Sequence, residues 1–152
     1  MAEFAPLKIF LQRHAKKYHE RNLARTYGAF EGDRIAAYVT LVCGEIVLEG
    51  DADLLDEPDL AYRYKSYPAV KIARLLVDTR YRNGNVGAAL VHLSLGIAKD
   101  KISPAVGCRF VTVDAKRDSV GFYAKQGFTL LDTQGNRDRL EPVMFLDLHR
   151  AA

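Results

Sequence analysis

Apolar positions in the second half of the chain alternate between runs typical of buried strands and stripes typical of helices. Residues 70–78 predict a strand that is nearly continuously apolar from Ile72 except for Arg74, which is typical of a central strand covered on both faces. Residues 86–101 place apolar side chains on one helical face, and Pro104 lies just beyond them. The same patterns predict strands at 109–114, 128–131 and 142–148, a helix at 118–126, and a polar loop at 133–139.

The first half of the chain has a different order of elements. Residues 7–21 carry apolar side chains at helical spacing, and residues 24–30 and 34–43 form a hairpin about a tight turn. Residues 45–48 extend the second strand past a kink at Gly44. The acidic stretch that follows predicts a loop, which Pro68 ends. An antiparallel half followed by strand–helix alternation predicts an α/β fold, with a mixed α+β-type central sheet flanked by helices.

Composition narrows the class of protein without naming a function. The 152 residues suit one domain, residues 1–152, and no apolar run is long enough to span a membrane. The first residues lack the pattern of a signal peptide. Cys43 and Cys108 lie in apolar segments, which predicts buried free thiols in a reducing compartment such as the cytoplasm. The four histidines are scattered, so we expect no metal site.

The net charge of +3 conceals a strong segregation of charge along the chain. Residues 1–25 carry six basic and two acidic side chains, residues 45–59 carry seven acidic and no basic ones, and residues 62–82 carry six basic and one acidic. A basic face could bind a polyanion such as RNA or a nucleotide phosphate. Each cluster taken singly is as well explained by a solvated helix face or loop.

The turn after the predicted central strand is the first candidate site. It reads Arg80-Tyr81-Arg82-Asn83-Gly84-Asn85-Val86-Gly87 and opens onto the helix of residues 86–101. Backbone N–H groups at a helix N-terminus, with two arginines beside them, are typical of a pyrophosphate site. The spacing fits neither a P-loop nor a dinucleotide fingerprint, and an ordinary strand-to-helix turn is an equal alternative on this evidence.

A second motif favours the pyrophosphate interpretation. Phe122-Tyr123-Ala124-Lys125-Gln126-Gly127-Phe128 follows the predicted strand of residues 109–114, and Val113-Asp114-Ala115-Lys116 precedes it. Together the two motifs resemble those of the GNAT superfamily of acetyl-CoA-dependent N-acyltransferases. The resemblance extends from Phe10 to Leu148. Its N-terminal part, 10–15 with 23–27, is similar to the branch of bacterial toxin–antitoxin acetyltransferases that act on aminoacyl-tRNA.

The resemblance implies a cofactor, acetyl-CoA, and the residues that bind it. The pantetheine arm would pair with the backbone near Leu75, Leu76 and Val77. The pyrophosphate would lie on the turn formed by Arg80, Arg82, Asn83, Gly84, Asn85, Val86, Gly87 and Ala88. Asn83 and Asn85 stand where the family has glycines, which leaves open a non-enzymatic module that binds CoA or a partner without turnover.

The resemblance also implies one catalytic residue, Tyr123, as the general acid for the leaving thiolate, because a tyrosine pKa near 10 is close to that of a thiol. Without the resemblance, a core tyrosine would be the better interpretation. No residue is convincing as a general base. Glu45 could border the site but fits a solvated loop equally well. An α-amino group needs little help, because it is partly neutral at pH 7.

The implied acceptor is the α-amino group of aminoacyl-tRNA, with a small-molecule or protein amine as the alternative. Arg13, Lys16, Lys17 and Arg21 are the candidate RNA phosphate contacts. The branch further implies a cognate antitoxin as partner. The sequence leaves a homodimer open, and no membrane association is expected.

Overall fold

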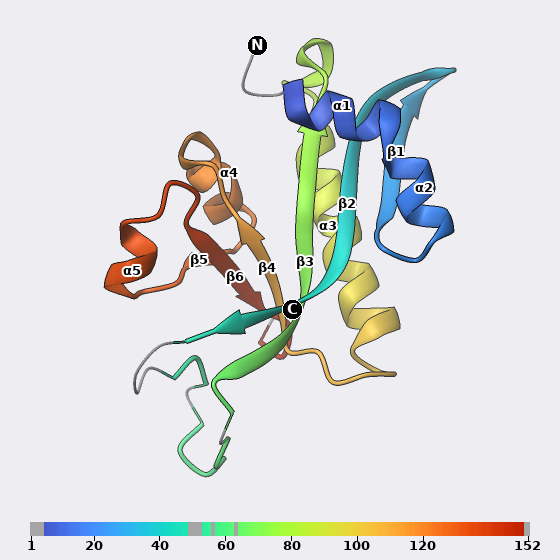
Figure 1. The fold of residues 1–152 in the computed structure, drawn as a ribbon. Coiled ribbons are helices and arrows are strands. Elements are labelled where there is room, and N and C mark those ends of the chain that lie inside the picture. Colours follow the sequence, from blue (N-terminus) through green and yellow to red (C-terminus); the bar gives the residue numbers. More distant parts are fainter. Residues whose placement is uncertain (1–4, 49–52, 56, 63, 151–152) are drawn as a thin grey trace.

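A mixed sheet organises the molecule, and its strand order places the candidate site. The computed structural model describes residues 5–48, 53–55, 57–62 and 64–150 (Figure 1). Six strands lie in the order β1-β2-β3-β4-β6-β5, and only β3 and β4 run parallel. The strands are β1 (Arg25–Glu31), β2 (Arg34–Val47), β3 (Ser66–Val77), β4 (Phe110–Asp114), β5 (Thr129–Leu130) and β6 (Val143–Asp147). The predicted mixed α/β sheet is therefore confirmed.

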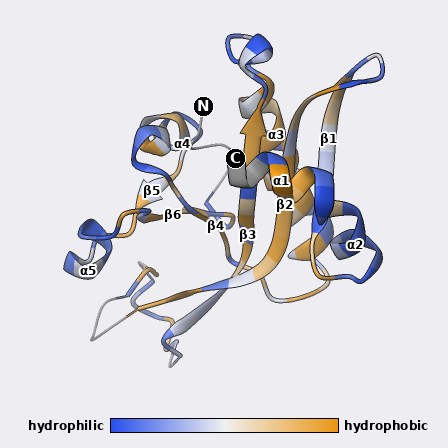
Figure 2. Ribbon diagram, turned by 45° about the horizontal axis from the view of Figure 1, so that its top comes forward, coloured by the Kyte–Doolittle hydropathy of each residue, from blue (hydrophilic) through white to orange (hydrophobic). Residues whose placement is uncertain are grey.

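Helices cover both faces of this sheet (Figures 1 and 2). On one face, Phe10 and Ala15 pack with Tyr38 and Leu76 in an apolar cluster under the N-terminal helices. On the other face, a larger cluster joins β2, β3 and β4 to the helices in the second half of the chain. The helices are α1 (Ala5–Arg13), α2 (Ala15–Glu20), α3 (Val86–Ile97), α4 (Val120–Lys125) and α5 (Gln134–Arg137), with short turns η2 (Thr79–Tyr81), η3 (Ala98–Ile102) and η4 (Arg117–Ser119).

Several predicted boundaries are wrong for identifiable reasons. The single helix predicted at residues 7–21 is broken between α1 and α2 at His14. Pro68 lies inside β3 opposite Glu45 rather than before the strand, a position near the strand start where the missing N–H is tolerated. The polar loop predicted at 133–139 contains α5, because the Thr133 hydroxyl accepts a hydrogen bond from the Asn136 N–H at 3.2 Å and caps a helical turn.

The cysteines and the end of the long helix also differ from expectation. Cys43 is exposed, whereas a buried thiol was expected, and Cys108 is half-buried; both are free. The helix predicted to run to residue 101 changes at Ala98 into the π-helical turn η3. Within the described chain, no helix has the length and apolarity to cross a bilayer.

A bulge in β3 decides which side chains face which helices. Thr40 pairs with Arg74 and Leu41 pairs with Ile72, so Ala73 is an extra residue without a partner in β2. A bulge of this kind reverses the alternation of side chains beyond it. Ile72 before the bulge and Leu75 after it therefore both join the cluster on the α3 face.

Candidate active site

The strands at the centre of the sheet separate and leave a cleft between them. β3 and β4 pair over only four residue pairs, from Ala69 with Phe110 to Ile72 with Val113. β3 then continues to Val77 while β4 turns away toward α4 (Figure 1). Among the described strands, none lies beside the β4-facing edge of β3 past Ile72, so the backbone N–H and C=O groups there can pair with an extended ligand.

A cavity of about 540 Å³ occupies this cleft. Its walls come from the β3 bulge region, the end of β4 and the start of α4. The main lining residues are Ile72, Ala73, Leu75, Val113, Ser119 and Tyr123. The cavity thus brings together two of the sequence-predicted site residues, Leu75 and Tyr123.

Tyr123 lies at the back of the cavity on α4. Its side chain is 6% exposed, and its ring centroid lies 5.1 Å from that of Phe122 and 5.6 Å from that of Phe128, edge to face in both cases. Burial raises the pKa of Tyr123 well above its ordinary value of 10. Among the described residues its hydroxyl has no hydrogen-bond partner, so the phenol is held protonated and available to a ligand in the cleft.

This raised pKa changes one part of the sequence argument. We expected the phenol and the leaving thiol to have nearly equal pKa values, and the tyrosine is now the weaker acid. Burial raises the pKa of a thiol in the same cavity as well, because an apolar site disfavours either anion. The pKa values of the phenol and the thiol are therefore close only when both groups are buried in the cavity together.

The turn between β3 and α3 forms a preorganised helix N-terminus. Asp78 accepts a hydrogen bond from the backbone N–H of Arg80 at 3.0 Å and caps η2. Asn85 precedes α3 in the left-handed region, with φ of 60° and ψ of 17°. Asparagine tolerates this conformation better than other non-glycine residues. Asn85 therefore adopts a backbone conformation that glycine also allows.

Gly87 serves close packing in the same turn. A Cβ atom at Gly87 would lie 3.3 Å from Val77 Cγ2 and 3.4 Å from the Phe122 ring. The first turn of α3 can therefore approach β3 and α4 only because residue 87 lacks a side chain. This contact brings the α3 N-terminus, where the first N–H groups have no helical partner, to the open end of the cleft.

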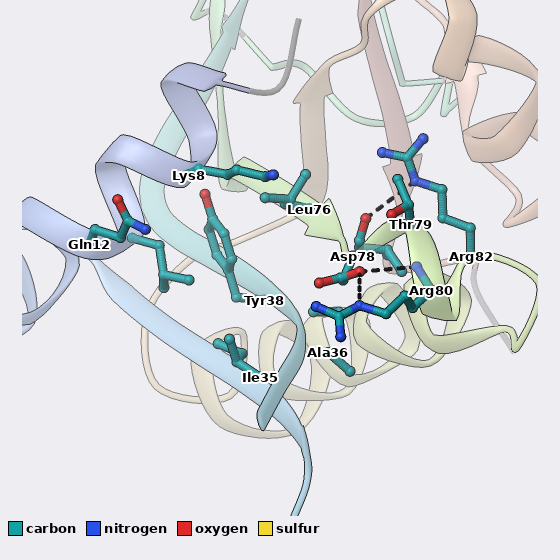
Figure 3. A pocket seen from close by; sticks show the side chains of 13 residues that line it. Lys8, Gln12, Ile35, Ala36, Tyr38, Leu76, Asp78, Thr79, Arg80 and Arg82 are labelled. Carbon is teal, nitrogen blue, oxygen red and sulfur yellow. Dashed lines mark hydrogen bonds and ion pairs between the residues drawn. The ribbon is translucent and has the colours of Figure 1, made fainter. Parts of the chain in front are cut away.

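The two arginines predicted for the pyrophosphate turn diverge in space. Arg82 Nε donates to the Val77 carbonyl oxygen at 3.3 Å, at the end of the free strand edge. Arg80 Nε lies 3.4 Å from Asp78 Oδ1, and its guanidinium extends toward Ile35 and Ala36 (Figure 3). The hydrogen bond from the Arg80 backbone N–H is the largest of the effects that lower the pKa of Asp78, and the Arg80 charge adds to it.

The side of the cleft that faces α1 carries charged residues, which were not among the predicted site residues. Lys71 Nζ lies 2.8 Å from Asp114 Oδ2, and Arg139 lies 3.8 Å from the same carboxylate. The Arg74 guanidinium stacks 3.7 Å from the centroid of the Phe10 ring. Lys71 directly before the apolar run and Arg74 within it are the signals in the sequence that could have identified these two cations.

Glu45, the weak candidate base, lies in a different hollow. It accepts a hydrogen bond from the Ser66 hydroxyl at 2.5 Å and lines a cavity of about 300 Å³ that Lys71 and Asp114 also border. Tyr123 does not line that cavity. The structure therefore does not bring Glu45 and Tyr123 together.

The predicted RNA contacts are exposed but lie on two helices. Arg13 ends α1, and Lys16 and Lys17 lie on α2, with Arg21 just beyond it. Lys16 is 4.0 Å from Glu20 across one helical turn, and both side chains are largely exposed. α2 packs beside β1, away from the cleft (Figure 1). These cations form a surface at a distance from the cleft and add nothing to its lining.

A further cavity, of about 360 Å³, lies between α1, the start of β2 and the end of β3. Lys8 and Gln12 of α1, Tyr38, Asp78 and Arg80 line it (Figure 3). Burial raises the pKa of Tyr38 to about 12, although the nearby Arg74 charge acts in the opposite direction. This phenol is therefore neutral at physiological pH.

Comparisons with known proteins identify the family to which this fold and cleft belong. The model of the acetyltransferase (GNAT) family matches residues 2–128. No curated protein matches the chain.

Three solved structures resemble it over 95% of its length. AtaT complexed with acetyl-methionyl-tRNAfMet has a TM-score of 0.76 and 23% identity, with 82% of that chain covered. AtaTR bound with AcCoA has a TM-score of 0.71 and 25% identity, with 81% covered. A structure described as a bacterial toxin has a TM-score of 0.81 and 17% identity, with 79% covered.

Proposed function

The chain belongs to the acetyltransferase (GNAT) family, and from that membership we propose that it transfers an acetyl group from acetyl-CoA to the α-amino group of an aminoacyl-tRNA. The observation that carries the acetyl-CoA part is the free edge of β3 in the cleft, which leads from the cavity at Tyr123 to the α3 N-terminus. A thioester with an extended amide arm and a pyrophosphate needs these features in this order. The left-handed conformation of Asn85 supports the catalytic interpretation, because this asparagine holds a backbone geometry that glycine also allows.

The residues that would hold acetyl-CoA follow from this geometry. The backbone at Leu75–Val77 would pair with the amides of the arm. Arg82 and the N–H groups of the turn would hold the pyrophosphate, together with Asn83, Gly84, Asn85, Val86, Gly87 and Ala88. When bound, acetyl-CoA supplies the activated acetyl group as a thioester.

The chain's own residues then orient the groups and move one proton. The reaction forms an amide bond, breaks the carbon–sulfur bond, and leaves one proton to pass from the amine and one to reach the sulfur. Tyr123 holds a proton in the cavity at physiological pH and is the proposed donor to sulfur. The amine loses its proton to solvent, and the tyrosinate takes one proton back from solvent, so the enzyme returns to its starting state.

We place the acceptor on the α1 side of the cleft, where Lys71 and Arg74 line the cavity and Arg74 stacks on Phe10 of α1. Asp114 and Glu141 line the same cavity, and Asp114 is paired with Lys71. An α-amino group with a pKa near 7.7–8.0 is partly neutral even without a base, so we assign neither carboxylate that role.

The aminoacyl-tRNA acceptor is supported by two further observations. One of the similar structures holds acetyl-methionyl-tRNA, although identity at that level establishes only the fold. The exposed cations Arg13, Lys16, Lys17 and Arg21 provide the charge that an RNA stem requires. Other similar structures hold AtaT with the antitoxin AtaR, and we propose a protein antitoxin as a second partner of this chain.

A competition among acceptors tests the proposal. Purified protein is incubated with labelled acetyl-CoA and one of three acceptor classes: charged tRNAs prepared singly, polyamines, and lysine-containing peptides. The proposed function predicts label on one or more charged tRNAs with a kcat/KM at least about a hundredfold above that for the other amines, the order expected of a site that binds the whole acceptor. Preferential acetylation of the peptides or polyamines would assign a different acceptor to the same cleft.

A further inference from the structure

The cavity between α1, β2 and the end of β3 lies on the α1 face of the sheet and borders the acetyl-CoA turn, because Val77 and Arg82 also line it. Its wall is formed by Lys8, Gln12 and Tyr38 on one side and by Asp78 and Arg80 on the other (Figure 3). Tyr38 belongs to the apolar cluster under α1, whereas Tyr123 belongs to the cluster on the opposite face of the sheet. The cavity therefore opens on the face from which the acceptor enters.

The charges in this cavity favour an anion. Lys8, Arg80 and Arg82 line it against the single carboxylate of Asp78. Asp78 is hydrogen bonded to the backbone N–H and Nε of Arg80, so it orients that guanidinium while its own charge is balanced. Lys8 makes no ion pair or hydrogen bond with any described residue. The Lys8 charge acts on Asp78 at longer range and helps to lower the pKa of that carboxyl. A lysine without a direct contact beside an oriented arginine is suited to a phosphate group.

The rest of the lining fits an anion that carries an organic group. Leu11, Ile35 and Leu76 give the cavity an apolar floor, and the Tyr38 ring is buried beside them. Gln12 adds an amide at the rim. A nucleotide combines a phosphate with a sugar and a flat base, which matches a charged rim above an apolar floor.

The position of the cavity matches one part of the acceptor. Asp78 follows the end of β3, five residue steps beyond the bulge at Ala73, a span of roughly 17 Å in an extended strand. The α-amino group that reacts near the bulge belongs to an amino acid esterified to the terminal ribose. The phosphodiesters of the last nucleotides are the nearest acceptor anions, and an acceptor that runs along β3 toward Asp78 would place one of them at this cavity.

From these observations we propose that the cavity binds a phosphodiester of the single-stranded 3′ end of the acceptor RNA, with Lys8 as the main contact and Arg80 oriented by Asp78 as the second. This assignment rests on the proposed function and extends it. It gives Arg80 a ligand on the RNA side, whereas Arg82 borders both this cavity and the turn and stays with the acetyl-CoA pyrophosphate. The cations of α1 and α2 would then contact the double-stranded stem.

The test uses Lys8→Ala, with Lys101→Ala as the matched control because Lys101 is an exposed lysine on η3, far from this cavity in the sequence and on a different element. Acetyl transfer is measured on an aminoacylated oligonucleotide ending in CCA and on the corresponding aminoacyl-adenosine without phosphate. We expect Lys8→Ala to raise KM for the oligonucleotide by about five- to tenfold, the order of one charge-assisted contact. KM for aminoacyl-adenosine and the Kd for acetyl-CoA should stay within twofold, and Lys8→Arg should restore most of the loss.

Three results would overturn the inference. An unchanged KM for the oligonucleotide in Lys8→Ala would show that Lys8 does not contact the RNA. An equal loss with aminoacyl-adenosine would remove the phosphate from the explanation. A rise in the Kd for acetyl-CoA would assign the cavity to the cofactor.

Failure of the proposed function gives a different result. If the wild-type protein acetylates no aminoacylated RNA, the acceptor assignment is wrong. The proposal that the cavity binds RNA is then tested by a binding measurement. The uncharged CCA-ended oligonucleotide is then titrated by fluorescence anisotropy at several salt concentrations. Lys8→Ala should weaken binding and lower the slope of log K against log salt by about 0.7, one single-strand phosphate contact. Equal affinity and equal slope for Lys8→Ala and the wild type would overturn the inference.

Discussion

Two glycines of α3 allow a sharp test of how the helix N-terminus reaches the cleft. At Gly96 an added Cβ would meet nothing within 4 Å, whereas at Gly87 it would lie 3.3 Å from Val77 Cγ2 and 3.4 Å from the Phe122 ring. Replacing a helical glycine with alanine raises the free energy of unfolding by about 0.5–1 kcal/mol where the added methyl group has space. Overpacking a tight contact costs about 1–3 kcal/mol.

Whether Gly87→Ala raises or lowers the free energy of unfolding depends on whether the neighbouring side chains can move. Val77 is β-branched and lies in a paired strand, and Phe122 packs edge to face on Tyr123, so neither is the free end of a flexible side chain. Gly87 is also the second residue of α3, where the helix propensity gain is smallest. We therefore expect Gly87→Ala to lower the free energy of unfolding by about 1 kcal/mol and Gly96→Ala to raise it by about 0.5 kcal/mol.

Urea unfolding of the two variants gives the comparison, because they differ by the same single methyl group in one helix. Titration with acetyl-CoA supplies the second readout: Gly87→Ala should also weaken binding, since α3 must shift away from β3, whereas Gly96→Ala should bind like the wild type. Equal stabilisation by both substitutions, with unchanged acetyl-CoA affinity, would refute the argument that close packing at residue 87 positions the site.

Three more predictions concern the cleft and the RNA surface. Tyr123→Phe should lower kcat by at least about tenfold with little change in the Kd for acetyl-CoA, as measured by single-turnover kinetics and titration, and an unchanged rate would remove Tyr123 from the mechanism. Asn85→Gly should keep the stability and acetyl-CoA affinity of the wild type, whereas Asn85→Val should cost about 1–2 kcal/mol in urea unfolding because φ at this position is 60°; equal stability of the two would contradict the observed turn. Replacing Arg13, Lys16, Lys17 and Arg21 with alanine should weaken tRNA binding and reduce its salt dependence without changing acetyl-CoA affinity, and unaltered tRNA affinity in a filter-binding assay would disprove this RNA surface.

The sequence predicted the parts of this site that depend on local pattern. The apolar run that becomes β3, the helix that becomes α3 and the glycine at the end of α4 each follow from spacing or from one residue's backbone preference. Gly127, with φ of 99°, is such a residue and ends α4 as expected. The pairing of a turn motif with the Phe122–Phe128 motif then indicated the family.

The parts that were missed depend on contacts between distant segments. The bulge at Ala73 arises from the register of β3 against β2 and leaves no trace in the apolar run. Cys43 lies in a strand that predicts burial, yet it is exposed in the folded sheet. The separation of Arg80 from Arg82 depends on Asp78 and on the position of α1, which no local pattern specifies.

Transfer of labelled acetyl groups to tRNA before and after removal of its amino acids tests the central claim most directly. Total tRNA is charged, divided, and one half is deacylated by mild alkali before both are incubated with the protein and labelled acetyl-CoA. The account predicts label in the charged half alone, released by later ester hydrolysis as an N-acetyl amino acid. Label in both halves, or label in neither while acetyl-CoA binds, would contradict the assignment of aminoacyl-tRNA as the acceptor.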